Sequence, residues 1–102
     1  MQSSDELKQA ILLTLSKIPV GKVSTYGDIA KRAGLPGHAR YVGRMLKTLP
    51  PESSIPWHRV ISANGCISLP ENSPSYVEQI QRLKSENINV KQGKVRLSHY
   101  RW

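Results

Sequence analysis

The residues best suited to chemistry lie in one stretch near the middle of the chain, Pro56 to Val60. It reads Pro-Trp-His-Arg-Val, so an indole, an imidazole and a guanidinium are consecutive. Histidine can serve as a general base, arginine can stack and donate several hydrogen bonds, and tryptophan can stack on a nucleobase. The same residue types also suit a core tryptophan that anchors a loop beside two solvated side chains. Spacing alone leaves the two interpretations open.

Local preferences place this stretch at the entry to a strand. Pro56 biases Ile55 toward an extended conformation, and Val60 and Ile61 favour a strand. Further on, Asn64-Gly65 is a strong signal for a tight turn, so residues 60–68 are predicted to form a hairpin. The stretch is therefore predicted to be a bend that leads into a strand and displays the tryptophan ring.

Composition bounds the possible functions of the chain. Its 102 residues suit a single domain over residues 1–102, and a net charge of +8 points to a polyanionic partner. The basic residues alternate with core positions, which is more typical of a folded nucleic-acid surface than of a disordered tail. Cys66 is the only cysteine and the three histidines lie far apart, so we expect no disulfide, metal or cofactor. No membrane-spanning or signal pattern occurs, and we expect a cytoplasmic protein.

Three helices are predicted in the first half of the chain. Ser3 and Glu6 fit a capping box for an amphipathic helix over residues 4–17, with Leu7, Ile11, Leu15 and Ile18 on its buried side. A short helix is predicted from Thr25 to Ala33. The turn residues 34–37 end it, and another helix is predicted over residues 38–49. This arrangement predicts a helix-turn-helix, although any helical hairpin would look similar.

The helix over residues 38–49 has two distinct faces. Val42, Leu46 and Leu49 are predicted to be buried, and the opposite face carries the cations Arg40, Arg44 and Lys47. Ala39 and Gly43 add no bulk beside the cations. A helix is about 10–12 Å across and the B-DNA minor groove only about 6 Å wide, so a helix that enters it needs small residues and a bent duplex. An ordinary solvated basic face would explain the arginines but not the pairing of Ala39 with Gly43, and the residues alone leave both interpretations open.

The last third of the chain is predicted to contain one more helix. Ser73 suits an N-cap and Pro74 the first helical position. The inward stripe of this helix is predicted to consist of Tyr76, Val77, Ile80, Leu83 and Asn87. Residues 90–102 could form a small hairpin or a basic tail, and the sequence favours neither.

Three of these segments carry a family resemblance. Pro56 to Val60 resembles the Pro-Cys-His-Arg-Val active-site motif of the O6-alkylguanine-DNA alkyltransferases, with tryptophan in place of the nucleophilic cysteine. That replacement is typical of alkyltransferase-like proteins. The segment from Ala39 to Gly43 is similar to the recognition-helix motif of the family. The segment from Ser24 to Asp28 resembles the family segment whose tyrosine crowds the target phosphate. The resemblance implies a mainly α fold with small β hairpins, a winged helix-turn-helix of the alkyltransferase C-terminal type.

The resemblance also implies roles for individual residues. Arg40 would fill the gap left by an extruded base, and Tyr26 would help to rotate the nucleotide out of the helix. His58 and Glu86 would be the vestige of the relay that activates the missing thiol. The implied lesion pocket consists of Tyr26, Trp57, Val60 and Cys66, and the implied DNA-binding residues are Tyr26, Ala39, Arg40, Gly43, Arg44 and Lys47.

A protein without the thiol is expected to read lesions and not to repair them. The resemblance implies minor-groove binding to double-stranded DNA, flipping of O6-alkylguanine without chemistry, and transfer of the complex to nucleotide excision repair. We expect a monomer that does not bind membranes, and that is associated with the nucleoid, or nuclear in a eukaryote, when it is bound to DNA. Two alternatives remain: a cryptic transferase or hydrolase that uses Cys66 or His58, and a generic helix-turn-helix regulator.

Overall fold

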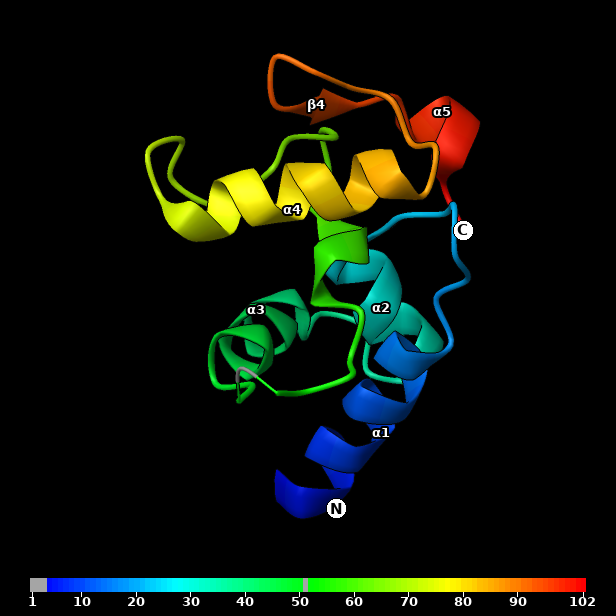
Figure 1. The fold of residues 1–102 in the computed structure, drawn as a ribbon. Helices are drawn as coiled ribbons and strands as arrows, with labels where there is room; N and C mark the ends of the chain where they lie inside the picture. Colours follow the sequence, from blue (N-terminus) through cyan, green and yellow to red (C-terminus); the bar gives the residue numbers. More distant parts are fainter. Residues whose placement is uncertain (1–3, 51) are drawn as a thin grey trace.

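The computed structural model describes residues 4–50 and 52–102, which form five α-helices, one 3₁₀ turn and four two-residue strands. In chain order these elements are α1 (Ser4–Ser16), β1 (Ser24–Thr25), α2 (Tyr26–Arg32), α3 (Ala39–Lys47), the 3₁₀ turn η1 (Trp57–Arg59), β2 (Val60–Ile61), α4 (Pro74–Ser85), β3 (Val90–Lys91), β4 (Lys94–Val95) and α5 (Leu97–Tyr100). The predicted mainly helical fold with small β elements is confirmed (Figure 1). None of the described helices is long and apolar enough to cross a membrane.

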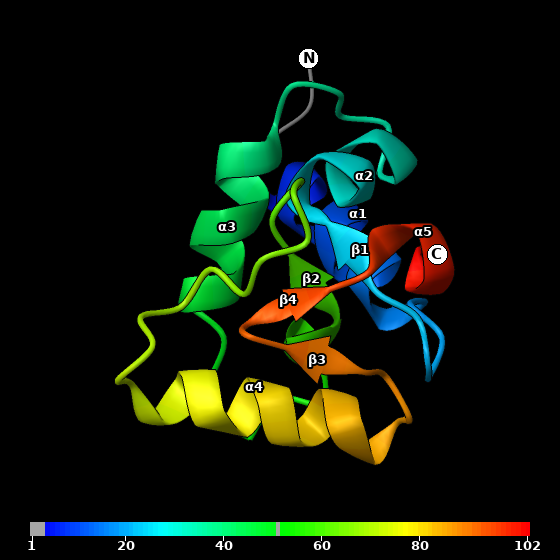
Figure 2. The ribbon, with the colours of Figure 1, turned by 90° about the horizontal axis from the view of Figure 1, so that it is seen from above.

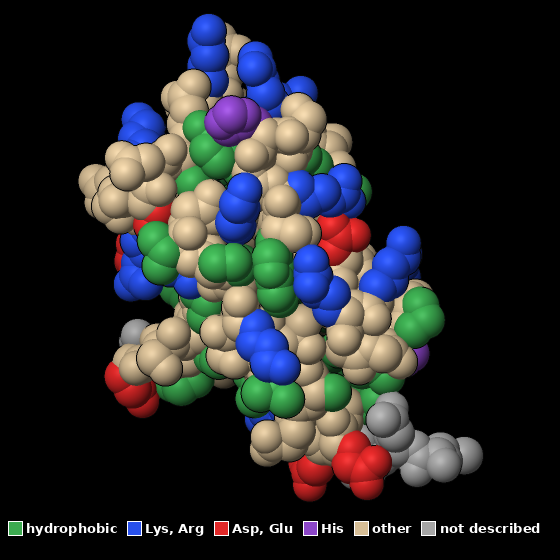
Figure 3. All heavy atoms as spheres, turned by 90° about the vertical axis from the view of Figure 1, so that its right-hand side faces the viewer, with side chains coloured by type: hydrophobic (Ala, Val, Ile, Leu, Met, Phe, Trp, Pro, Cys, Tyr) green, Lys and Arg blue, Asp and Glu red, His purple; other side chains and the backbone are tan. Residues whose placement is uncertain are grey.

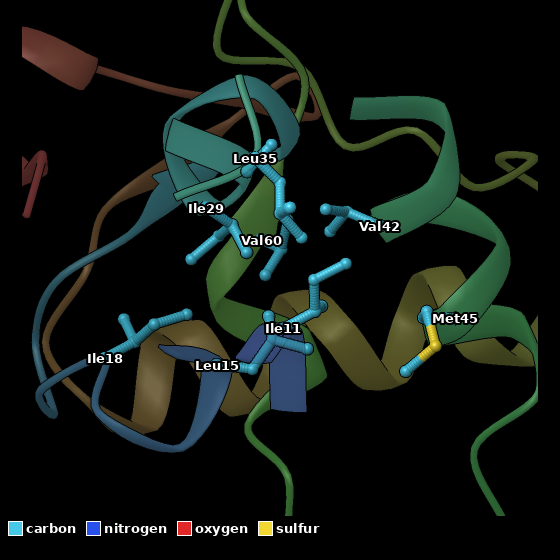
Figure 4. Packing of buried hydrophobic residues seen from close by; sticks show 9 residues of the cluster. Ile11, Leu15, Ile18, Ile29, Leu35, Val42, Met45 and Val60 are labelled. Atoms are coloured by element: carbon cyan, nitrogen blue, oxygen red, sulfur yellow. The ribbon is translucent and has the colours of Figure 1, made fainter. Parts of the chain in front are cut away.

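The first three helices enclose one hydrophobic core. Ile11, Leu15 and Ile18 of the predicted stripe are buried, and they pack with Ile29 of α2 and Val42 of α3 (Figure 4). The start of α2 is capped as its sequence indicates, because the side chain of Thr25 accepts a hydrogen bond from the backbone N–H of Asp28. The predicted capping box at the start of α1 involves Ser3, which lies outside the described residues.

The buried face of α3 is rotated relative to the prediction. Val42 and Met45 are its buried residues, whereas Leu46 and Leu49 are only partly buried. Leu46 still packs against the first core, but it is less buried than Val42 and Met45.

The predicted hairpin over residues 60–68 forms only next to its turn, where the N–H of Ser62 bonds to the carbonyl of Cys66. β2 pairs in parallel with β1, with Ser24 opposite Val60, and Cys66 forms an antiparallel bridge with Lys94. The turn itself forms: the N–H of Gly65 bonds to the carbonyl of Ser62. Gly65 has φ +86°, which glycine adopts without strain. The local turn signal was therefore correct, but each arm takes a partner distant in sequence.

β2 joins the two cores of the molecule. Successive residues of a strand point to opposite faces, so Val60 packs into the first core and Ile61 into a second one. The second core also contains Val23, Ile67, Leu83, Ile88, Val90 and Val95.

α4 supplies one wall of the second core. Ser73 caps it and Pro74 occupies its first turn, as predicted. Its predicted inward stripe is partly wrong, because Val77 is 50 % exposed and Asn87 is also exposed. Gln79 is buried instead, and its side-chain amide donates to the backbone carbonyls of His58 and Val60.

The C-terminal segment forms a hairpin and then a short helix. β3 and β4 pair antiparallel, which decides between the two arrangements that the sequence left open, and α5 follows at once. The chain then returns to the first half, where the N–H of Trp102 bonds to the carbonyl of Val23. In Figure 1, α4 crosses the middle of the molecule, with α2 and α3 on one side and the β3–β4 hairpin on the other; Figure 2 shows the same elements from above.

Candidate functional site

An open cleft of about 950 Å³ runs between α3, α4 and the 3₁₀ turn. It is lined by Tyr26, Ala39, Arg40, Gly43, Arg44, Leu46, Lys47, Leu49, Pro50, Ser53, Trp57, Val60, Ser68, Leu69, Ser75, Glu78, Gln79 and Arg82. The predicted pocket residues Tyr26, Trp57 and Val60 are all in this lining, and so are the predicted DNA-contacting residues of α3. Segments far apart in the sequence thus meet at one concave surface.

Cys66 is the exception among the predicted pocket residues. It is not part of the lining of this cleft, and its backbone is instead held in the turn by Ser62 and bridged to Lys94. Ser68 and Leu69, which follow it, do reach the cleft.

Tyr26 lies against the small side of α3. A Cβ atom added at Gly43 would be 3.9 Å from two carbon atoms of the Tyr26 ring, which is ordinary van der Waals contact. Tyr26 is the first residue of α2 and directly follows the Thr25 cap. The cap and the packing of α2 on α3 therefore fix the backbone position from which the tyrosine side chain extends. A bulky residue at position 43 would displace the tyrosine.

Trp57 opens the 3₁₀ turn and presents its ring to the cleft. Its ring meets that of His58 edge-on, with 6.2 Å between ring centroids. The guanidinium carbon of Arg82 lies 5.5 Å from the Trp57 ring centroid, within the range of a cation–π contact. Nη2 of Arg82 also pairs with Oε2 of Glu78 at 2.7 Å. The cleft therefore combines an aromatic surface with one cation and one carboxylate on α4.

Sequence reasoning missed the contribution of α4 to the cleft. Ser75, Glu78, Gln79 and Arg82 all line it. The spacing contained a usable signal, because residues 75, 78, 79 and 82 recur at intervals of three and four and so share one face of a helix. The prediction assigned that region only an apolar stripe.

Behind the cleft, His58 is held by Glu86. Nε2 of His58 lies 2.7 Å from Oε2 of Glu86, and the same carboxylate accepts from the guanidinium of Arg59 at 2.8 Å. The backbone N–H of Gly21 donates to its other oxygen at 3.1 Å, while Nη1 of Arg59 donates to the carbonyl of Ile18. The proposed vestigial relay pair is thus in hydrogen-bond contact, within a network that also ties α4 to the loop after α1.

This network determines the charges of its members. Burial favours the protonated form of Glu86, but hydrogen bonds from Arg59, His58 and Gly21 outweigh it and lower the pKa of Glu86 to about 2. Burial lowers the pKa of His58 below its ordinary value despite the adjacent carboxylate. At neutral pH Glu86 is therefore ionised and His58 is uncharged.

The hydrogen bonds also indicate the tautomer of His58. Because the ionised Glu86 carboxylate can only accept, the proton of the neutral ring belongs on Nε2. Nδ1 is then an acceptor, and it is buried without a hydrogen-bond partner among the described residues. In this state His58 could take up a proton at Nδ1, but His58 is not among the lining residues of the cleft. The lining contains no thiol, and its hydroxyl groups are those of Ser53, Ser68, Ser75 and Tyr26.

Within residues 4–50 and 52–102, no group of three or more His, Cys, Asp or Glu side chains is arranged to hold a metal ion. The arrangement is suited to binding: two aromatic side chains and the basic face of α3 line the cleft, and the network of His58, Arg59 and Glu86 lies behind it.

Comparisons with known proteins agree with this geometry. The model of the 6-O-methylguanine DNA methyltransferase DNA-binding domain matches residues 6–88. The "DNA base-flipping protein" of Vibrio parahaemolyticus is 46% identical over 99 residues, which cover 96% of this chain and 97% of that protein. The "Alkyltransferase-like protein 1" of Schizosaccharomyces pombe is 41% identical over 103 residues, with 96% and 95% covered.

Solved structures give the same answer in three dimensions. S. pombe Atl1 in complex with damaged DNA containing O6-carboxymethylguanine superposes with a TM-score of 0.91 at 40% identity, covering 99% of this chain and 98% of that one. Mycobacterium tuberculosis OGT in complex with DNA superposes at 0.68 with 32% identity, covering 83% of this chain and 51% of that one. The chain therefore belongs to the family of the 6-O-methylguanine DNA methyltransferase DNA-binding domain, as an alkyltransferase-like member.

Proposed function

We propose that this protein recognises O6-alkylguanine in duplex DNA, rotates the damaged nucleotide out of the helix and holds it without chemistry. The observation that carries the proposal is the shared cleft: Trp57 and Tyr26 line the same concave surface as the basic face of α3. The names of the relatives support it, since one is called a DNA base-flipping protein and another structure holds an O6-alkylated guanine.

The basic face of α3 suits the DNA side of this function. Arg40, Arg44 and Lys47 are exposed and line the cleft, where they can contact phosphates. Arg40, at the start of α3, would enter the base stack, where its planar guanidinium can stack and satisfy the orphaned base. Ala39 and Gly43 keep the helix slim, which a minor-groove approach requires.

The lesion side would be formed by the aromatic residues. Flipping a nucleotide costs a few kcal/mol, and least for a poorly paired base, so O6-alkylguanine opens more readily than guanine. The extruded base would stack on Trp57, and Tyr26 would crowd the phosphate from which it rotates. Selectivity would therefore arise from both the weakened base pair and the aromatic surface.

Catalysis is not part of the proposal because no thiol lines the cleft. Alkyl transfer from guanine O6 needs a thiolate activated by a neighbouring base, and the indole nitrogen of Trp57 has no available lone pair. Cys66 lies outside the lining of the cleft, which gives no support to a cryptic transferase.

We further propose that the bent complex directs the lesion to nucleotide excision repair, and that the protein acts as a monomer without a cofactor. Its proposed location is the cytoplasm, with the nucleoid, or the nucleus in a eukaryote, as the place where it meets DNA. These statements rest on the family resemblance of the three motifs and on the basic charge of the chain.

Two measurements on the same duplex pair test the function. Binding is measured to a duplex with one central O6-methylguanine and to the same duplex with guanine, and we expect clearly tighter binding to the first. After long incubation, intact mass should show no added methyl group and the lesion should remain in the DNA. Equal affinity for the two duplexes would contradict the proposed lesion recognition. Methylation of the protein would show that it is an alkyltransferase.

A further inference from the structure

We propose that a hollow between the β3–β4 hairpin and α5 is a second binding site for the phosphate backbone of DNA. This hollow has a volume of about 520 Å³, and its lining consists of Asn89, Lys91, Gln92, Lys94, Val95, Arg96, His99 and Tyr100. Three of these residues are cations and none is acidic. Residues 87–102 contain no aspartate or glutamate at all.

The hairpin carries an internal charge conflict that a bound anion would relieve. Lys91 and Lys94 are direct cross-strand partners in the β3–β4 ladder, and both are exposed. Like charges directly opposite each other destabilise a sheet. No ion pair with Lys91, Lys94 or Arg96 is present among the described residues. A polyanion lying in the hollow would supply the missing countercharge.

The hollow is held in a defined shape. The turn of the hairpin has Gln92 and Gly93 at φ +53° and +72°, and Gly93 sits so close to Tyr76 of α4 that an added Cβ would collide with its hydroxyl. The N–H of Ile67 bonds to the carbonyl of Gly93, and the N–H of Val95 bonds to the carbonyl of Gly65. A site whose walls are already fixed loses little conformational freedom on binding.

This hollow is separate from the lesion cleft. The two share no lining residue. In Figure 1, α4 lies between α3 and the hairpin, and Figure 3, which views the side of α5, shows Lys and Arg side chains around a histidine on the upper part of that face. The molecule is 42 Å long, somewhat more than the roughly 34–36 Å of one turn of B-DNA. The proposed occupant is therefore a bent duplex longer than one turn, or a neighbouring duplex.

The chemistry of the lining favours nucleic acid over an acidic protein. Stable protein interfaces have an apolar, often aromatic centre with a polar rim. In the hollow, Val95 is buried in the second core, and the hydroxyl of Tyr100 already accepts a hydrogen bond from the N–H of Asn89. The charged side chains of the lining, Lys91, Lys94 and Arg96, are all cationic and exposed, which suits a phosphate backbone bound by counterion release.

The test uses the full chain and two variants with the same change in net charge. The site variant is Lys91→Gln, Lys94→Gln, Arg96→Gln, and the control variant is Lys8→Gln, Lys17→Gln, Lys22→Gln. The control residues are exposed and line neither the hollow nor the lesion cleft. Thermal melting checks that both variants fold, and we expect the site variant to melt no lower than the parent because it loses the Lys91–Lys94 repulsion.

Three DNA arms separate the possible sources of the phosphates. The first is a duplex of about 11 base pairs with a central O6-methylguanine, close to one helical turn, and the second is about 30 base pairs with the same centre. The third saturates the protein with the short duplex and measures binding of a separate labelled, undamaged duplex. In each arm, affinity is measured against salt concentration.

On the long duplex we expect the site variant to lose about 0.9 from the salt slope for each missing phosphate contact, or about 2–3 in all, and the control variant to lose markedly less. A loss confined to the third arm would assign the site to a neighbouring duplex. Equal salt slopes for the site and control variants, both on the long duplex and in the third arm, would overturn the proposal. Binding to polyglutamate is measured as well, and a site variant that loses polyglutamate binding but keeps its DNA binding would also overturn it. Lesion preference on the short duplex reports on the proposed function separately.

Discussion

Arg59 binds both carboxylate oxygens of Glu86, with Nε 2.9 Å from Oε1 and Nη2 2.8 Å from Oε2. Glu86 lies 27 residues further along the chain, so this two-point contact links the 3₁₀ turn η1 to the end of α4. Both side chains are nearly buried, at 13% and 12% exposed. The carboxylate that contacts His58 is thus also a structural anchor, which gives a physical reason for it to be present in a chain without the nucleophile.

Glu86→Gln should destabilise the protein and flatten its stability at acid pH. The pKa of Glu86 is lower in the folded state, about 2, than its ordinary value of 4.5. Its contribution is therefore complete above about pH 4.5 and is lost as the pH falls toward 2, and we expect it to be about 3 kcal/mol. Urea unfolding from pH 2 to pH 7 measures this. A parent and variant with parallel pH curves would contradict it.

His58→Gln should leave lesion binding within a few fold while removing a pH dependence near neutrality. Burial lowers the pKa of His58. The unfolded chain therefore binds its proton more readily, so the stability of the parent falls as the pH drops below about 6.5. Glutamine can still donate to Glu86 but does not titrate. Unfolding at pH 5 and pH 8 gives the stability difference, and a large loss of lesion affinity in a folded variant would assign His58 a direct role.

Local signals predicted the helices well because their determinants are close in sequence. Thr25 and Ser73 each accept a hydrogen bond from the N–H three residues on, and Pro74 follows the second cap directly. The turn at Asn64 and Gly65 is equally local. The strand partners are not: Cys66 bridges to Lys94, whose position depends on how the whole C-terminal segment packs.

Sequence motifs identified some residues of the cleft, and the residues that only packing brings there were missed. The motifs pointed to Tyr26, Arg40 and Trp57, which do line one cleft. No motif marks Arg82 or buried Gln79, because their roles follow from α4 lying across the 3₁₀ turn. Hydrophobic periodicity cannot predict contacts between elements that are distant in the sequence.

Arg40→Ala should weaken binding to damaged and undamaged duplexes alike, by about tenfold or more, because the proposed role of Arg40 in the base stack would support any extruded base. Lys47→Gln is the matched comparison on the same face of α3 and should mainly lower the salt slope of binding, by about 0.9 for one phosphate contact. Titrations at several salt concentrations distinguish the two effects. Unchanged lesion binding by Arg40→Ala would reject its assigned role.

Trp57→Ala should lower affinity for O6-alkylguanine DNA by about 1–3 kcal/mol, the value of stacking on one base, while binding to undamaged DNA changes little. If Trp57 only supported the fold, thermal stability would drop and both affinities would fall together. Fluorescence in a Trp102→Phe background gives an independent measurement, since lesion DNA should alter Trp57 emission more than matched undamaged DNA. Equal changes in emission with the two duplexes would contradict the assignment of Trp57 to the lesion pocket.

Arg82 should make the cleft sensitive to the charge of the adduct. Its guanidinium lies over the Trp57 ring and pairs with Glu78 on the same helix, so a base stacked on Trp57 would have a cation beside it. An adduct that carries a carboxylate can accept a charge-assisted hydrogen bond from Arg82, worth about 1.5–3 kcal/mol, whereas a methyl group cannot.

Arg82→Ala should therefore weaken binding to O6-carboxymethylguanine DNA more than binding to O6-methylguanine DNA. Glu78→Gln should act in the opposite direction, because it frees Arg82 from its intrahelical partner and removes a carboxylate that repels the adduct. Both residues are about half exposed, at 46% for Arg82 and 50% for Glu78, so neither change should cost much stability. Affinities of the parent and the two variants for the two lesions and for guanine form a complete comparison. If both variants shifted the two lesions equally, Arg82 would contribute general attraction for DNA and no discrimination between adducts.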